Sequence, residues 1–259
     1  MIIKALTQFK FLKKMKKKLH LSISQGFIPV MLLFFSVLFK ACSGSADAFI
    51  EKAKVHLSAG QPKEALNYLN QAINKDSKNA QAFNMRGAAY FELKDFNNAL
   101  LDYEQAIKLD PNNYKPFFNR ASVKMERGDW EGALADCSEA SKLDPQNDEI
   151  YVKRGIVLAA LRNTEEAVKD FDKAISLNPK ETNALYNRGN IFFQLGELDK
   201  AYDDFSAAIK VDPKFAKAFY GLGIIQQKQG KNDDACLSLK QAKRLGYPDA
   251  KDALKTFCE

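Results

Sequence analysis

The sequence predicts an all-α solenoid of helical hairpins, because small residues recur along it at a constant spacing. Three sets of alanine or glycine each repeat every 34 residues. They are Ala65, Ala99, Ala133, Ala167, Ala201 and Ala235; Ala72, Ala106, Ala140, Ala174, Ala208 and Ala242; and Ala53, Gly87, Ala121, Gly155, Gly189 and Gly223. Such a period is typical of repeat architectures. The predicted repeats span 46–79, 80–113, 114–147, 148–181, 182–215 and 216–249.

Each repeat is expected to contain a helix, a short turn and a second helix. The internal turn carries glycine in segments such as 126–129 and 194–197. The second helix of the inner repeats should stop at Asp-Pro or Asn-Pro, because a residue before proline avoids the helical conformation. Asn163 and Glu166 have the spacing of a capping box at the start of one second helix. Isolated helices of about a dozen residues are only marginally stable in water, so the hairpins must be stabilised by stacking on one another.

A charged pattern accompanies the inner repeats. Position seven is Arg86, Arg120, Arg154 and Arg188, and position 23 is Asp102, Asp136, Asp170 and Asp204. The arginine and the aspartate are both missing from the first and last repeats, which have Lys52 and Leu222 at position seven and Tyr68 and Ser238 at position 23. We interpret them as a ladder of partly buried Arg–Asp pairs within or between hairpins. The alternative is a set of solvated charges that contribute little.

The repeat resembles the tetratricopeptide repeat (TPR), in which aromatic, small and proline positions recur in a 34-residue hairpin. The resemblance covers residues 46–249, with Ser77 in place of proline in the first repeat and a shifted Tyr247-Pro248 in the last. Position four is expected to pack against the small residues and is occupied by Phe49, Phe83, Phe117, Tyr151, Leu185 and Phe219. The resemblance implies a right-handed superhelix of six hairpins, with residues 250–259 as a C-terminal capping helix or tail.

The resemblance also implies a concave groove lined by first helices, at positions two, five, six, nine, twelve and thirteen. Carried over to this chain, those positions give an aromatic and amide-rich surface, the composition of a binding hot spot. The candidate peptide-binding residues are Asn84, Phe91, Phe118, Asn119, Tyr186, Asn187, Asn190, Phe193 and Tyr220. The alternative is that several rings pack against neighbouring helices. The carboxylate clamp of some relatives is not matched, since Ile50, Lys54 and Asn119 depart from it.

The N-terminal 41 residues are expected to be a signal peptide. They contain eight lysines and no acidic residue, and an apolar run over 27–39 follows the lysines. The run is shorter than a comfortable membrane span and contains Pro29, which favours a removable signal. Met15 is an alternative start. We therefore predict an exported protein.

The segment around Cys42 resembles a bacterial lipoprotein signal. Leu38, Ala41 and the small residues after Cys42 match it, whereas Phe39 and Lys40 depart from it. The resemblance implies lipidation of Cys42, residues 42–45 as a tether, and a lipoprotein of the cell envelope that faces the periplasm or the surface. The alternatives are cleavage after Gly44 and an uncut anchor.

Composition excludes several classes of function. From residue 42 onward, 31 basic residues stand against 32 acidic ones, which removes the charge that a non-specific nucleic-acid binder needs. The sequence shows no catalytic constellation, no phosphate-binding loop and no metal-ligand spacing, so we expect no enzyme, cofactor, metal or small-molecule substrate. Cys137 falls at a core position, and Cys236 and Cys258 are expected to belong to no obligatory disulfide framework.

These observations favour a scaffold of the cell envelope that binds proteins or peptide segments and reaches the membrane through its lipid anchor. One alternative is an assembly factor resembling the lipid-anchored pilotins, by analogy of size and anchor. Another is a soluble periplasmic regulator that delivers substrates to a protease.

Overall fold

The structure, a computed structural model, describes residues 44–258. The expected signal peptide and the expected lipidation site Cys42 lie outside the described residues. Within this part of the chain there are 13 helices, paired into hairpins that are stacked in chain order, so the all-α fold class is confirmed. None of these helices is long and apolar enough to cross a membrane.

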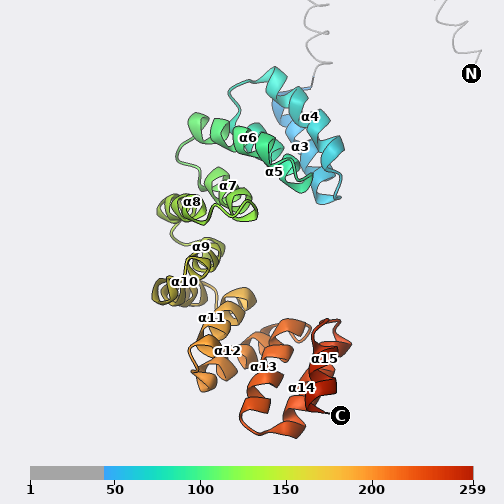
Figure 1. The fold of residues 1–259 in the computed structure, drawn as a ribbon. Helices are drawn as coiled ribbons and strands as arrows, with labels where there is room; N and C mark the ends of the chain where they lie inside the picture. Colours follow the sequence, from blue (N-terminus) through green and yellow to red (C-terminus); the bar gives the residue numbers. More distant parts are fainter. Residues whose placement is uncertain (1–43, 259) are drawn as a thin grey trace, which may run out of the picture. The chain divides into compact units, whose positions relative to one another are not determined.

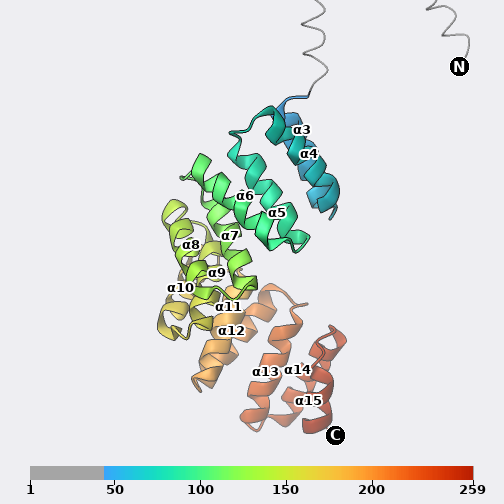
Figure 2. The ribbon, with the colours of Figure 1, turned by 45° about the horizontal axis from the view of Figure 1, so that its top comes forward.

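Six hairpins follow one another from the N-terminal to the C-terminal end of the superhelical unit (Figure 1). They are α3 (Ala46–Ser58) with α4 (Pro62–Lys75), α5 (Ala80–Glu92) with α6 (Phe96–Leu109), α7 (Tyr114–Glu126) with α8 (Trp130–Leu143), α9 (Asp148–Ala160) with α10 (Thr164–Leu177), α11 (Thr182–Gln194) with α12 (Leu198–Val211), and α13 (Ala216–Lys228) with α14 (Asn232–Arg244). Each first helix also packs against the second helix of the preceding hairpin, and α15 (Ala250–Phe257) packs on α14 (Figure 2).

The two helices of a hairpin meet where a small residue at position eight faces a large one at position 24. A Cβ added to Gly87 would lie 2.7 Å from the ring of Tyr103, and one added to Gly155 would lie 2.8 Å from Phe171. The position-24 side chains are at most 1% exposed, and they are Leu69, Tyr103, Cys137, Phe171, Phe205 and Leu239. The large side chains that fill these contacts thus come from the second helix. The position-four side chains, which were expected to pack against the small residues, do not fill this contact at position eight. Tyr151 and Leu185 instead share core clusters with other alanines of the repeat, Ala174 and Ala208.

The turn inside each hairpin requires a left-handed residue at position 15. Glycine supplies it at four of the six places, and Lys94 (φ 61°) and Arg162 (φ 62°) adopt the same conformation despite the steric cost to a residue with a Cβ. The expected capping box at α10 was wrong, because the Asn163 side chain accepts no capping hydrogen bond. Asp95 and Asp129 do cap the corresponding helices α6 and α8.

The Arg–Asp ladder is present as four bidentate pairs, each within one hairpin. In the second of the four, Arg120 donates from Nε and Nη2 to Asp136 at 2.9 and 2.7 Å. The aspartates are only 5–8% exposed at the side chain, so the alternative of solvated charges was wrong. The pairs are Arg86–Asp102, Arg120–Asp136, Arg154–Asp170 and Arg188–Asp204.

Three of the four arginines also reach the second helix of the preceding hairpin. Arg86 Nη1 donates to Asn70 Oδ1 at 2.8 Å, Arg154 Nη1 donates to Ser141 Oγ at 2.7 Å, and Arg188 Nη1 donates to Asp172 Oδ1 at 2.5 Å. One guanidinium group therefore connects three helices. The ladder stabilises the stacking of hairpins as well as each hairpin.

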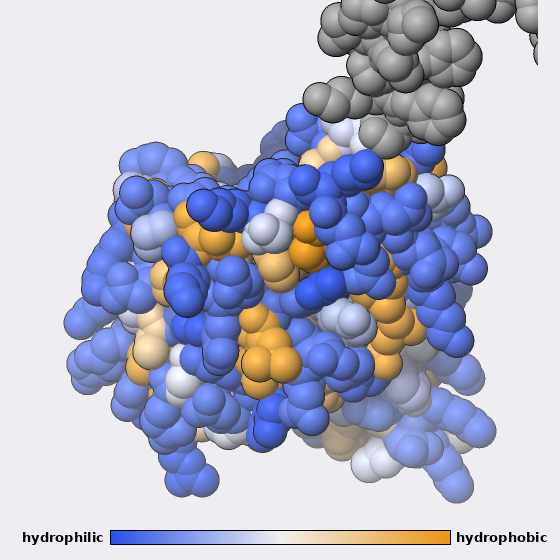
Figure 3. All heavy atoms as spheres, turned by 90° about the horizontal axis from the view of Figure 1, so that it is seen from above, coloured by the Kyte–Doolittle hydropathy of each residue, from blue (hydrophilic) through white to orange (hydrophobic). Residues whose placement is uncertain are grey.

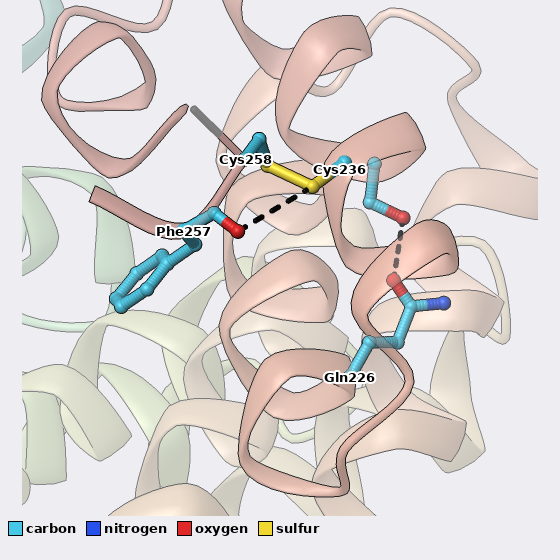
Figure 4. The surroundings of a disulfide bond; sticks show 5 residues. Gln226, Cys236, Phe257 and Cys258 are labelled. Carbon is cyan, nitrogen blue, oxygen red and sulfur yellow. Dashed lines mark hydrogen bonds between the residues drawn. A yellow bond between two sulfur atoms is a disulfide. The ribbon is translucent and has the colours of Figure 1, made fainter. Parts of the chain in front are cut away.

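The last hairpin has a neutral pair in place of the charged one, and a disulfide joins its second helix to the segment that follows it (Figure 4). Ser238 Oγ donates to Gln226 Oε1 at 2.7 Å in a buried position. A disulfide joins Cys236 of α14 to Cys258, the residue after α15. The expectation that these cysteines belong to no disulfide framework was wrong. Cys137 is fully buried, and burial raises its pKa to about 12, so it remains an inert thiol.

We expect Arg154→Ala to lower the free energy of unfolding by about 1 to 3 kcal/mol, because it leaves the buried carboxylate of Asp170 without its hydrogen-bond donors. The matched control is Lys180→Ala, which removes an exposed cation from a turn. Denaturant unfolding followed by circular dichroism measures both. Equal stabilities for the two variants would mean that the pair contributes nothing.

Candidate functional site

A groove runs along the first helices of the repeats and contains two adjoining pockets. The first, here called the central pocket, has a volume of about 530 Å³ and is built by α5, α7, α9, α11 and α13, together with Glu181 just before α11. The second, the C-terminal pocket, has a volume of about 250 Å³ and is built by α11, α13 and Tyr247 with the ring of Phe205. Tyr186 and Lys217 line both pockets, which makes the groove continuous.

Seven of the nine candidate binding residues line these pockets. Phe91, Phe118 and Asn187 line the central pocket; Asn190, Phe193 and Tyr220 line the C-terminal pocket; and Tyr186 lines both. Asn84 and Asn119 line neither of them. Asn119 Nδ2 donates to Asn84 Oδ1 at 3.0 Å, so this amide pair connects α5 to α7.

The groove rings are half-buried, and one side of each packs on the protein. The ring of Tyr186 lies 5.8 Å from that of Phe205 and 5.4 Å, edge to face, from that of Phe215. Phe193 packs on the same cluster, and the Phe91 ring lies 5.9 Å from that of Phe96. The same rings therefore contribute to folding and to the groove surface. Seen from above, hydrophobic atoms reach a mainly hydrophilic surface in separate patches (Figure 3).

Lys153 is a functional candidate that the sequence analysis missed. Its Nζ lies 3.3 Å from the centroid of the Phe118 ring and donates to Phe118 O at 3.0 Å and to Ser122 Oγ. Among the described residues it forms no ion pair with a carboxylate. Burial lowers the pKa of Lys153 to about 8, although Cys137 and Glu149 act in the opposite direction. A lysine at position six was the only sequence signal for it.

Three more groove rings carry a lysine ammonium group within cation–π distance. Lys94 lies 5.5 Å from the Phe91 centroid, Lys217 lies 6.0 Å from Tyr186, and Lys228 lies 5.7 Å from Phe193. The central pocket also contains the carboxylates of Glu126, Glu149 and Glu181. The groove thus offers apolar faces together with charges of both signs.

The described residues contain no group of three or more histidine, cysteine, aspartate or glutamate side chains that could hold a metal ion. His56 stacks on the ring of Tyr68 at 5.3 Å and pairs through Nδ1 with Gln61 Oε1 at 2.7 Å. The acidic pairs Glu165-Glu166 and Asp233-Asp234 lie in the first turns of α10 and α14, where they complement the helix dipole. His56 thus has structural contacts, and the acidic pairs are explained by their place at helix N-termini.

Family comparison matches repeats over most of this unit. Tetratricopeptide repeat models match residues 80–113, 102–135, 148–181, 171–203 and 217–257, and a TPR repeat model matches 121–161 and 189–230. The chain belongs to the tetratricopeptide repeat family. A search of curated protein sequences found no match. TPR proteins are typically non-enzymatic scaffolds.

Solved TPR structures share the fold at low sequence identity. The pilF protein of Pseudomonas aeruginosa is 19% identical with a TM-score of 0.74, over 82% of this chain and 96% of that chain. YrrB is 23% identical with a TM-score of 0.58, over 72% and 97%. MamA is 26% identical with a TM-score of 0.57, over 64% and 96%. These similarities concern the TPR architecture.

We expect Lys153 to make a contribution to the free energy of unfolding that rises with pH between about 8 and 10.5, because folded Lys153 binds its proton less tightly than the unfolded chain does. Lys153→Met keeps the apolar stem and removes this term. The difference in free energy of unfolding between the wild type and the variant should therefore change by about 1 to 3 kcal/mol in favour of the wild type between the two ends of this pH window. Urea unfolding at several pH values measures the difference. Lys180→Met is the exposed control, and parallel curves for wild type and Lys153→Met would contradict the assignment.

Proposed function

We propose that the protein is an exported, lipid-anchored scaffold of the bacterial cell envelope that binds an extended segment of another protein in its groove. The observation that carries this proposal is the set of half-buried rings that α5, α7, α11 and α13 place along the two adjoining pockets. TPR proteins are protein-interaction scaffolds, and a structural neighbour, YrrB, is described as a TPR protein with an unusual peptide-binding site.

The chemistry of the groove supports a peptide ligand. Rings such as Phe118 and Tyr186 offer rigid apolar area, and the amide of Asn190 offers a donor and an acceptor for a peptide backbone. The ammonium group of Lys153 has no carboxylate partner among the described residues, so an acidic group on the ligand would complement it. These features favour a peptide that combines bulky apolar residues with an acidic one.

Two independent features support export. The first is the lysine-rich segment followed by an apolar run before Cys42. The second is the disulfide between Cys236 and Cys258, because such bonds form and persist in oxidising compartments outside the cytosol. The two features lie at opposite ends of the chain and rest on different chemistry.

Two alternatives to the general scaffold differ in whether the chain is anchored. A lipid-anchored assembly factor like a pilotin would use the same groove for one dedicated partner of the outer membrane. A soluble regulator that delivers substrates to a protease would lack the lipid. Cross-linking in intact cells followed by capture of the anchored protein would identify the partner and separate these cases.

We expect the double variant Phe118→Ala/Phe193→Ala to weaken peptide binding by about 10- to 100-fold, because both rings line the groove. Binding is measured by fluorescence polarisation with peptides selected from a phage-displayed library on the full chain in detergent. Unfolding in urea is measured in parallel, because both rings also pack on the protein.

The matched control is Phe117→Ala/Phe192→Ala, which removes the neighbouring ring on each of the same helices. These two rings are also half-buried but line neither pocket, and they lie beside Arg120 and Arg188. We expect similar losses of stability in the two double variants and a loss of binding in the first alone. If the groove variant bound the peptide as tightly as the control variant does, the ligand would lie outside the groove.

We expect the mass of the protein extracted from membranes to show loss of residues 1–41 and acyl chains on Cys42. Alkylation of the denatured, unreduced protein should modify one thiol, Cys137, because Cys236 and Cys258 are joined. A soluble product that begins after Gly44 would refute lipidation. Three alkylated thiols would refute an oxidising compartment.

A further inference from the structure

The C-terminal pocket differs from the rest of the groove in having a wall outside the repeats. Tyr247 lies between α14 and α15, and its ring centroid is 4.8 Å from that of Tyr220 on α13. Burial, reinforced by the nearby charge of Asp249, raises the pKa of both phenols. Both hydroxyl groups therefore stay neutral over the physiological range.

The position of Tyr247 is fixed by local structure. Helix α14 ends in a Schellman motif, in which Tyr247 N donates to Ala242 O at 3.0 Å and Gly246 N donates to Lys243 O at 2.9 Å. Gly246 adopts a φ of +86°, and Pro248 then prevents the helix from continuing. The disulfide closes the segment that contains this turn. The wall is thus held in place before any ligand binds.

The floor of the pocket depends on a missing side chain. A Cβ at Gly221 would lie 2.6 Å from the ring of Phe205, so glycine is needed for that ring to reach the pocket. Tyr186, Phe193 and Tyr220 supply further ring surface, and Ile224 completes the apolar lining. The polar groups of the lining residues are the amide of Asn190, the ammonium group of Lys217 and the phenol hydroxyls, and no lining residue is acidic.

The size of the pocket indicates one side chain as its occupant. Its volume of about 250 Å³ is below the roughly 300–1,000 Å³ of usual small-molecule sites. It is also continuous with the central pocket through Tyr186 and Lys217, so a peptide in the groove can reach it. Walls made of rings favour an aromatic occupant, because ring pairs gain from edge-to-face and offset contacts beyond their buried area.

We propose that the C-terminal pocket is a specificity site that takes one aromatic side chain of the bound peptide, with Tyr247 as its outer wall. This inference rests on the proposed peptide-binding function. The aromatic side chain lies against the rings of Tyr220 and Tyr247, and Asn190 hydrogen-bonds the adjacent peptide backbone. The site selects the partner, whereas the central pocket holds the rest of the segment.

The test is a double-mutant cycle on the full chain in detergent. Peptides are selected from a random phage-displayed library on the wild type, and the aromatic residue that they share is replaced by alanine. That replacement should weaken binding to the wild type by about tenfold but should change binding to Tyr247→Ala little. Tyr202→Ala, which removes a half-buried ring that lines neither pocket, is the control and should behave like the wild type. Circular dichroism shows whether each variant is folded, and Tyr247→Leu replaces Tyr247→Ala if the latter is not.

The failures of the two proposals give different results. Selected peptides that share no aromatic residue, or an aromatic replacement that weakens binding equally in the wild type and Tyr247→Ala, would overturn the specificity site alone. A library from which the wild type enriches no peptide would overturn peptide binding in the groove, and the specificity site with it. An aliphatic residue shared in place of an aromatic one would overturn the assigned occupant.

Discussion

The close contact between the two helices of each hairpin is the constraint on which the rest of the fold depends. A residue without a side chain at Gly87 or Gly155 lets the large ring of the partner helix pack directly on the backbone, with Tyr103 and Phe171 at most 1% exposed. Where the residue at position eight is alanine, as at Ala121, the facing side chain is the smaller Cys137. The fit between the small residue at position eight and the larger side chain at position 24 sets the distance between the two helices. A constant distance keeps successive hairpins in register.

The arginine at position seven adds a directional contact to this packing. A hydrophobic contact tolerates sliding, whereas a bidentate guanidinium–carboxylate pair fixes both distance and angle. Arg154 holds Asp170 in its own hairpin and Ser141 on the preceding one, and Arg188 likewise reaches Asp172. In the last described hairpin a neutral Ser238–Gln226 bond takes its place, and α15 packs on α14.

Because the hairpins stack regularly, each first helix packs on its neighbours with one side and lines the groove with the other. Tyr186 lies against Phe205 and Phe215 on one side and lines both pockets on the other. Rings held in this way lose little conformational freedom when a ligand binds, which favours affinity. The same arrangement means that a truncated groove ring affects stability too, so binding is assigned only by comparison with a matched neighbour such as Phe117 or Phe192.

The sequence by itself determined the period, the helix pairs and the Arg–Asp ladder, because these contacts are repeated and each copy supports the others. It also placed seven of the nine candidate residues at the groove pockets, since residues of one position share a face. Only the tertiary structure decided which side chains meet at particular interfaces. The Asn84–Asn119 bond and the contact of Lys153 with Phe118 both join position five of one repeat to position six of the next, but the residue types there vary from repeat to repeat. Tyr247 and the Cys236–Cys258 disulfide belong to a terminal segment outside the repeat, so no periodicity signals their contacts.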